Sequence, residues 1–211
     1  MLRALALSAL LWPLACAGAD KVCSPSRLLK VVTTIETPGM PKDHFLRVPT
    51  TLYRLGDGNG RIEESPNPRT GNHLLIVINE PDVWAVNLAL RKGKYQKDPG
   101  PTYYFRARLF DNSEARSAVI RTLEIGCEVK WLLEAGAKPL ETVHPTLGAV
   151  NQLEFVEGNE RLVLYERGGK PLQLEFYGPQ GWLKTTTYLS YEPDLKPDPR
   201  LFKQPKGINF E

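Results

Sequence analysis

The chain has 211 residues, with 27 lysines and arginines against 24 aspartates and glutamates, and only three cysteines. This length suits one ordinary domain with a full core. The near-balanced charge gives no electrostatic reason to expect a nucleic-acid partner, and no basic run indicates a patch for anionic membranes.

The first 19 residues have the pattern of a cleavable secretory signal. Arg3 supplies the positive start, residues 4–15 form an apolar run, and Ala17-Gly18-Ala19 has the small-x-small pattern that precedes cleavage. The run is shorter than the roughly 20 apolar residues of a membrane-spanning helix, and no later run is long enough. We therefore expect a mature chain that starts at Asp20, has no transmembrane segment, and works in the periplasm or as a secreted protein.

A second cleavage position competes with this one. Pro13-Leu14-Ala15-Cys16 resembles a degraded bacterial lipobox, in which Cys16 would carry lipid and become the first residue. The usual motif has leucine where Pro13 stands, so simple secretion is favoured over a lipoprotein.

Two cysteines, Cys23 and Cys127, remain in the mature chain. An even pair in an oxidising compartment is typical of a disulfide. The bridge would close a loop of about 100 residues. The alternative is two unpaired thiols, with Cys127 simply buried.

Most of the mature chain predicts strands and turns. Segments rich in apolar and β-branched residues, separated by Gly, Pro and Asn turns, predict early strands at 28–36, 44–55, 61–64, 73–79, 83–90 and 95–97. An aromatic-rich segment, 102–110, follows. Four later strands are predicted at 149–157, 161–167, 171–177 and 182–191, and their short links make them an antiparallel meander. The Pro-rich tail, residues 193–211, is expected to lie across the surface.

One long helix is predicted between these two sets of strands, over residues 113–135. Asp111 and Glu114 have the spacing of a capping box, and Gly136 suits the helix end. Apolar residues recur every four positions, at Ala115, Val119, Leu123, Cys127 and Trp131. Gly126 lies beside this stripe, and a mid-helix glycine lowers helix stability by about 1 kcal/mol relative to alanine. Either the helix tolerates this loss, or the glycine lets the helix backbone pack closely on the sheet.

Recognisable catalytic patterns are absent from the sequence. There is no Gly-x-Ser-x-Gly elbow and no phosphate-binding glycine loop. His44, His73 and His144 are isolated, so no pair has the spacing of metal ligands. We therefore expect no enzyme, no metal and no cofactor, and a hydrolase of unfamiliar type is the least favoured alternative.

Two strands carry the candidate ligand-binding residues. Period-two spacing places three apolar side chains of each strand on one face, and a sheet with an apolar face must cover it with a helix, a ligand or a partner. The candidates are Trp84, Val86 and Leu88 on the first strand, and Leu172, Leu174 and Phe176 on the second.

Three passages resemble the LolA/LolB-like superfamily of periplasmic lipoprotein carriers. The segment from Tyr53 to Glu64 is similar to that family's early paired strands. Leu75 to Leu90, with Val83-Trp84-Ala85-Val86, is similar to its apolar strand and following Trp-containing strand. Residues 184–208, with Asp194-Leu195-Lys196-Pro197-Asp198, resemble its closing strand, acidic loop and final Pro-x-Gly segment.

The resemblance implies a mainly β (α+β) fold. We expect a strongly curved antiparallel sheet that forms an unclosed half-barrel, with the one long helix covering the concave face, in a single domain over residues 20–211. It also implies a cavity for a lipid or lipoprotein acyl chain. Transfer of such a chain depends on apolar burial, worth about 0.8 kcal/mol per CH₂, and needs no catalytic group. The alternative is the same fold used to bind an envelope protein, as a sensor or scaffold.

Overall fold

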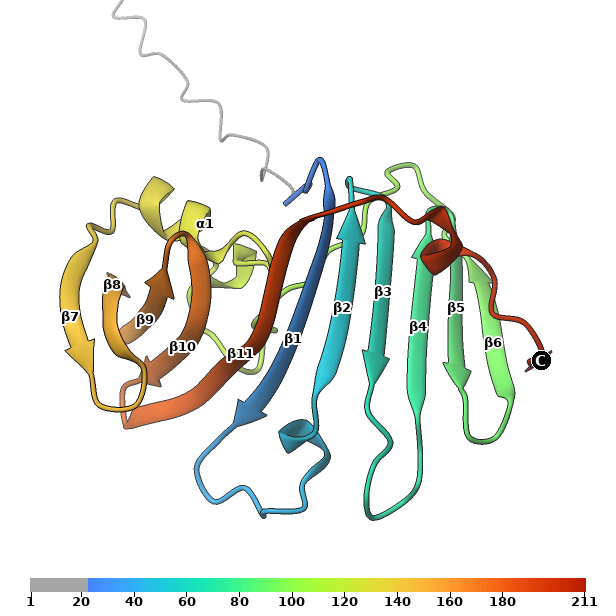
Figure 1. The fold of residues 1–211 in the computed structure, drawn as a ribbon, viewed down its shortest axis with the longest axis horizontal. Helices are drawn as coiled ribbons and strands as arrows, with labels where there is room; N and C mark the ends of the chain where they lie inside the picture. Colours follow the sequence, from blue (N-terminus) through green and yellow to red (C-terminus); the bar gives the residue numbers. More distant parts are fainter. Residues whose placement is uncertain (1–22) are drawn as a thin grey trace, which may run out of the picture.

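The computed structural model describes residues 23–211, which form one twelve-stranded sheet and one short α-helix (Figure 1). The predicted signal peptide, residues 1–19, and the lipobox cysteine Cys16 lie outside the described residues. Within 23–211, no helix is both long enough and apolar enough to cross a membrane.

The strands fall into two sets separated by the helix. The first set is β1 (Leu28–Glu36), β2 (Thr50–Leu55), β3 (Asn59–Glu64), β4 (Leu74–Asn79), β5 (Asp82–Asn87) and β6 (Lys92–Lys97). Then come α1 (Glu128–Glu134), β7 (Leu140–His144), β8 (Gly148–Glu157), β9 (Glu160–Arg167), β10 (Lys170–Gly178), β11 (Gly181–Leu195) and β12 (Asn209–Phe210). Three short 3-10 helices are η1 (Phe45–Arg47), η2 (Ile120–Thr122) and η3 (Pro199–Phe202).

The sheet consists of two meanders that meet at its centre. Its strand order is β12-β6-β5-β4-β3-β2-β1-β11-β10-β9-β8-β7, so β1 pairs with β11 and joins the two meanders. All pairs are antiparallel except β12 with β6. The end strands do not pair with each other, and the sheet stays open as the expected half-barrel; the prediction of a mainly β fold is confirmed.

We call the sheet face that α1 covers the inner face. Leu153, Leu164 and Leu174 stand opposite one another on β8, β9 and β10, and side chains paired in this way share a face. They form the main core with β1 residues and with the segment that leads into α1. The largest fully buried members are Leu29, Phe110, Ile120, Leu123, Leu132, Leu153, Leu162, Leu164, Leu174 and Phe176.

The opposite, outer face has its own cover over β4 and β5. The chain leaves β11 and runs across these strands to the end of the sheet (Figure 1). Ile208 and Phe210 pack against the buried Trp84 and Val86, and η3 packs against β3 and β4. The tail is therefore part of the packed structure, with β12 extending the sheet edge.

The predicted helix over residues 113–135 is wrong in its length. Only Glu128–Glu134 is α-helical, preceded by the single 3-10 turn of η2. The capping box forms as expected, since the Glu114 N–H donates to Asp111 at 3.0 Å and the Asp111 N–H donates to Glu114 at 3.1 Å. It caps an isolated turn, and no helix follows it.

Tertiary contacts take the backbone groups that such a helix would use. The N–H groups of Arg116 and Ser117 donate to the Glu160 carboxylate at 2.7 and 2.8 Å. Gly126 then breaks the helix, because its φ of +97° is left-handed and the Leu29 side chain lies where a Cβ would be. The stretch 105–127, which we call the crossing segment, therefore lies on the inner face as an irregular chain that folds back on itself, with an antiparallel bridge between Arg108 and Glu124.

Candidate functional site

The structure places the candidate ligand-binding residues on two different faces. Trp84 and Val86 pair with Val77 and Leu75 on the outer face, beneath the C-terminal tail. Leu88 follows β5 and packs against the same cluster. Because the two sets of side chains point to opposite faces of the sheet, no single groove contains both.

The β10 candidates belong to the inner face. Leu174 and Phe176 are fully buried under the crossing segment and α1. Leu172 lies at a register shift in the ladder between β9 and β10 and is half-buried. A contact between a ligand and any of the six candidates stays a prediction.

Over β3, β4 and β5 the inner face is only partly covered: Phe105 and Ala107 pack over one part of it, and the rest is open. Ile62, Ile76 and Ala85 stand opposite one another in the ladders, and Leu52 continues this row into β2 and the core. Ile62, Ile76 and Ala85 line a groove of about 370 Å³, at whose end Leu74 is 43% exposed. This volume lies within the usual range of small-molecule sites, and we call it the inner groove.

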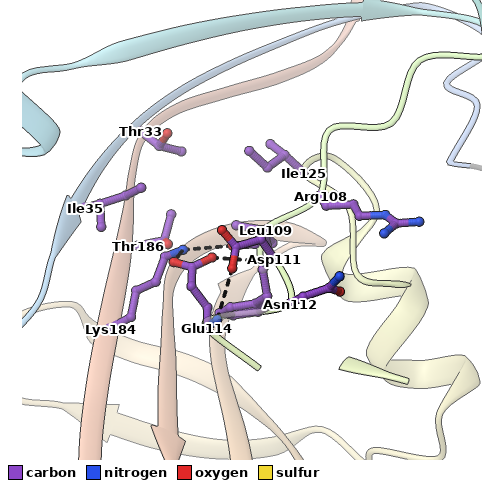
Figure 2. Close-up of a pocket in the computed structure, with 11 residues that line it drawn as sticks. Thr33, Ile35, Arg108, Leu109, Asp111, Asn112, Glu114, Ile125, Lys184 and Thr186 are labelled. Atoms are coloured by element: carbon purple, nitrogen blue, oxygen red, sulfur yellow. Dashed lines mark hydrogen bonds and ion pairs between the residues drawn. The ribbon is translucent and has the colours of Figure 1, made fainter. Parts of the chain in front are cut away.

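A second hollow of about 380 Å³ lies on the same face, between β1, β11 and the start of the crossing segment (Figure 2). Thr33, Ile35 and Thr186 form one wall. The Lys184 ammonium donates to the Leu109 carbonyl at 2.8 Å and forms an ion pair with Glu114 at 2.7 Å. The Lys184 cation is therefore already paired, and the lining mixes apolar side chains with polar ones such as Thr33, Thr186 and Asn112.

One row of side chains links the hollow to the inner groove. Thr33 stands opposite Thr50, and Thr50 stands opposite Glu64, which lines the groove. The two spaces therefore lie on one continuous sheet surface, the part of the inner face that the crossing segment leaves open.

Arg54 holds the crossing segment against the sheet. Its guanidinium, 0% exposed, forms an ion pair with Glu124 at 2.8 Å and donates to the carbonyls of Cys23, Phe105 and Ile125. Burial lowers the pKa of Arg54, and the Glu124 carboxylate opposes that effect. The segment is thus fixed by charge as well as by apolar packing.

A disulfide supports the same region. Cys23 and Cys127 are bonded, with their Cα atoms 6.0 Å apart, and the bond ties the start of the described chain to the end of the crossing segment. The Cys23 N–H also donates to Glu124 at 3.4 Å. Of the two alternatives for these cysteines, the structure contains the bridged one.

The buried Glu128 carboxyl predicts a pH-dependent stability. It accepts hydrogen bonds from the Tyr188 hydroxyl and the Gly126 N–H at 2.8 Å each, yet burial raises its pKa above the ordinary value of 4.5. The unfolded chain ionises at lower pH, so stability from this group is present below pH 4.5 and is lost as pH rises towards the folded pKa. In Glu128→Gln, the free energy of unfolding relative to the parent should increase with pH above about 4.5.

Chemical denaturation at several pH values measures this difference. Glu134→Gln, at an exposed position of the same helix, is the control for the effect of the substitution itself. A constant difference for Glu128→Gln between pH 4 and 8 would contradict the raised pKa.

No metal-binding cluster is present within the described chain: no three His, Cys, Asp or Glu residues are close enough together to hold an ion. The inner groove was missed from the sequence, although a signal existed. The run Leu74-Leu75-Ile76-Val77-Ile78 is apolar at every position, which is typical of a strand covered on both faces. The structure covers its outer face with the tail and leaves part of its inner face open.

Two solved structures are similar to this chain at the level of the fold. An uncharacterised conserved protein from Thermus thermophilus has 13% identity and a TM-score of 0.47, covering 88% of this chain and 90% of its own. A LolA superfamily protein from Nitrosomonas europaea has 12% identity and a TM-score of 0.32, covering 88% and 94%. No protein-family model matches the chain, and no curated protein matches it. The name of the Nitrosomonas protein is that of the superfamily that the sequence patterns resemble.

Proposed function

We propose that this protein is a non-enzymatic module that binds the acyl chain of a lipid or lipoprotein along the inner groove. The observation that carries the proposal is the partly open apolar row of Ile62, Ile76 and Ala85, which continues into the buried core at Leu52. Over β8, β9 and β10 the same face is closed by the crossing segment and α1.

The physics of the groove suits an acyl chain. Burial of apolar surface is favourable by about 25 cal/mol per Å², and a flexible chain can follow a curved sheet without specific polar partners. The groove floor provides few hydrogen-bonding groups, so it selects against strongly polar ligands.

We place this function outside the cytoplasm. The Cys23–Cys127 disulfide supports that location, because such bonds persist in oxidising compartments. The predicted signal at residues 1–19 supports it independently.

A titration with a fluorescent fatty-acid probe tests the proposal. We expect saturable binding of micromolar order, about −8 kcal/mol. Ile76→Glu should weaken it at least tenfold, because the substitution places a carboxylate on the groove floor at a cost of several kcal/mol. Leu140→Glu is the matched control at an exposed apolar position on β7, and it should bind the probe like the parent.

Thermal melts of both variants show whether they are folded. Equal probe affinity in folded Ile76→Glu and in the parent would move the site away from the inner groove. A folded parent that binds no probe would contradict acyl-chain binding altogether.

A second candidate function, protein binding, is favoured by the β7 edge of the sheet. Leu140 and Val143 are 62% and 79% exposed there, and β7 carries no lysine or proline. The other edge is protected from pairing with a foreign strand, because β6 carries three lysines and is partly paired with β12. An extended segment of an envelope protein could add to β7 as a further strand.

A further inference from the structure

Charged residues lie at the borders of the inner groove, and only some of them form ion pairs. Four of them line it: Glu64, Lys92, Lys94 and Glu211. Lys92 and Glu211 form an ion pair with each other at 3.6 Å. Within residues 23–211, Glu64 and Lys94 make no ion pair, so each charge faces the groove uncompensated.

These two charges lie at different places along the groove. Lys94 stands opposite Ala85, Ala85 opposite Ile76, and Ile76 opposite Ile62, so Lys94 ends the apolar row at the β6 edge. Neighbouring strands are about 4.8 Å apart, and the row from β6 to β3 therefore spans about 14 Å. Glu64 lies on β3, beyond Ile62 and away from the sheet edge.

The apolar row ends in one cation at the sheet edge. An amphiphile therefore fits it in one orientation, with its head group at the edge and its chain along the row. The Lys94 stem can lie along Ala85 while its ammonium stays in water, where it can meet a charged head group. A head group placed at the opposite end would lie beside the Glu64 carboxylate. Burial raises the pKa of Glu64, and a neighbouring anion would raise it further.

We infer that the inner groove prefers a long-chain fatty acid, with its carboxylate paired to Lys94 and its chain lying over Ala85, Ile76 and Ile62 towards β1. The inference rests on the proposed function and deepens it by naming the head group. A single ammonium suits a singly charged carboxylate, whereas bidentate phosphate recognition depends on arginine, and the groove lining contains none.

Displacement of the fluorescent probe by palmitate and by methyl palmitate tests the head group, since the two ligands share one chain. In the parent, palmitate should bind about fivefold more tightly, the size expected for one exposed ion pair. Lys94→Met keeps the apolar stem and should make the two affinities equal, with methyl palmitate unchanged. Lys97→Met is the matched control, because Lys97 lies on β6 like Lys94 but on the outer face, opposite Asp82 of β5. This variant should keep the preference for palmitate.

A second variant tests the orientation. Glu64→Gln removes the competing carboxylate and should strengthen palmitate binding while leaving methyl palmitate unchanged. Equal affinities in the parent, or a preference that survives in Lys94→Met, would overturn the inference while acyl-chain binding still stood. Tighter binding of lysophosphatidylglycerol than of palmitate would overturn the carboxylate assignment. Failure of both palmitate and its ester to bind would overturn the proposed function, and this inference with it.

Discussion

Arg54→Met should lower the free energy of unfolding by about 3–5 kcal/mol. The substitution leaves the Glu124 carboxylate, which is 2% exposed, without its main cation in the interior. It also removes the donors for three backbone carbonyls, at Cys23, Phe105 and Ile125. An uncompensated buried charge is among the most destabilising single changes known in proteins.

Urea denaturation of purified protein measures this loss. Arg61→Met is the control, because Arg61 forms a partly exposed pair with Glu63, and it should cost no more than about 1 kcal/mol. Arg54→Met combined with Glu124→Gln should recover part of the stability, since the stranded charge is then absent. Similar small losses in Arg54→Met and Arg61→Met would contradict the role given to the buried pair.

Removal of the disulfide should have a comparable effect. Cys23→Ser with Cys127→Ser opens a cross-link between residues 104 positions apart. In the chain-entropy model, a loop of that length contributes about 4–5 kcal/mol by restricting the unfolded chain. The same variant should be insensitive to reducing agents, whereas the parent should lose stability on reduction.

The two effects should not simply add. Arg54 donates to the Cys23 carbonyl at 2.7 Å, so the bridge and the ion pair hold the same short stretch of chain. A triple variant that lacks both should lose less stability than the sum of the separate losses. Strict additivity would show that the two contacts are independent.

Most of the strands could be predicted from local patterns. The run of β-branched residues from Leu28 to Glu36 gave β1 with both ends correct, because Pro38-Gly39 stops it sharply. The glycine turns after β8, β9 and β10 likewise located the second meander. The short strands β7 and β12 were missed, because their pairing depends on partners rather than on their own composition.

The crossing segment could not be predicted, because its conformation is decided by distant residues. The capping box at Asp111 and the four-residue apolar spacing are true local signals for a helix. Glu160, Leu29 and Arg54 lie far away in the sequence, and together they hold the segment in its non-helical, folded-back form. The close packing of Gly126 on the sheet was one of its two sequence interpretations, and it is the one the structure has.

In the candidate site too, local patterns predict some features and others depend on distant parts of the chain. Period-two spacing correctly indicated that Trp84 and Leu174 would be buried. It could not show that β5 and β10 present these residues to opposite faces, since that depends on the strand order across the whole sheet. The row at Ile62 and Ile76 is partly open because the crossing segment covers only part of the inner face there.

The central position of the β1–β11 ladder has a consequence for how the chain acquires its fold. β1 has two partners: β2 follows it closely in the chain, but β11 begins only at Gly181. The meander from β1 to β6 can form early from local contacts, whereas the β1–β11 ladder must wait for almost the whole chain. Until then, the edge of β1 and the side chains of Leu29 and Val31 are exposed to other chains. Folding is therefore completed late, and protection of this edge by a chaperone would matter most in that interval.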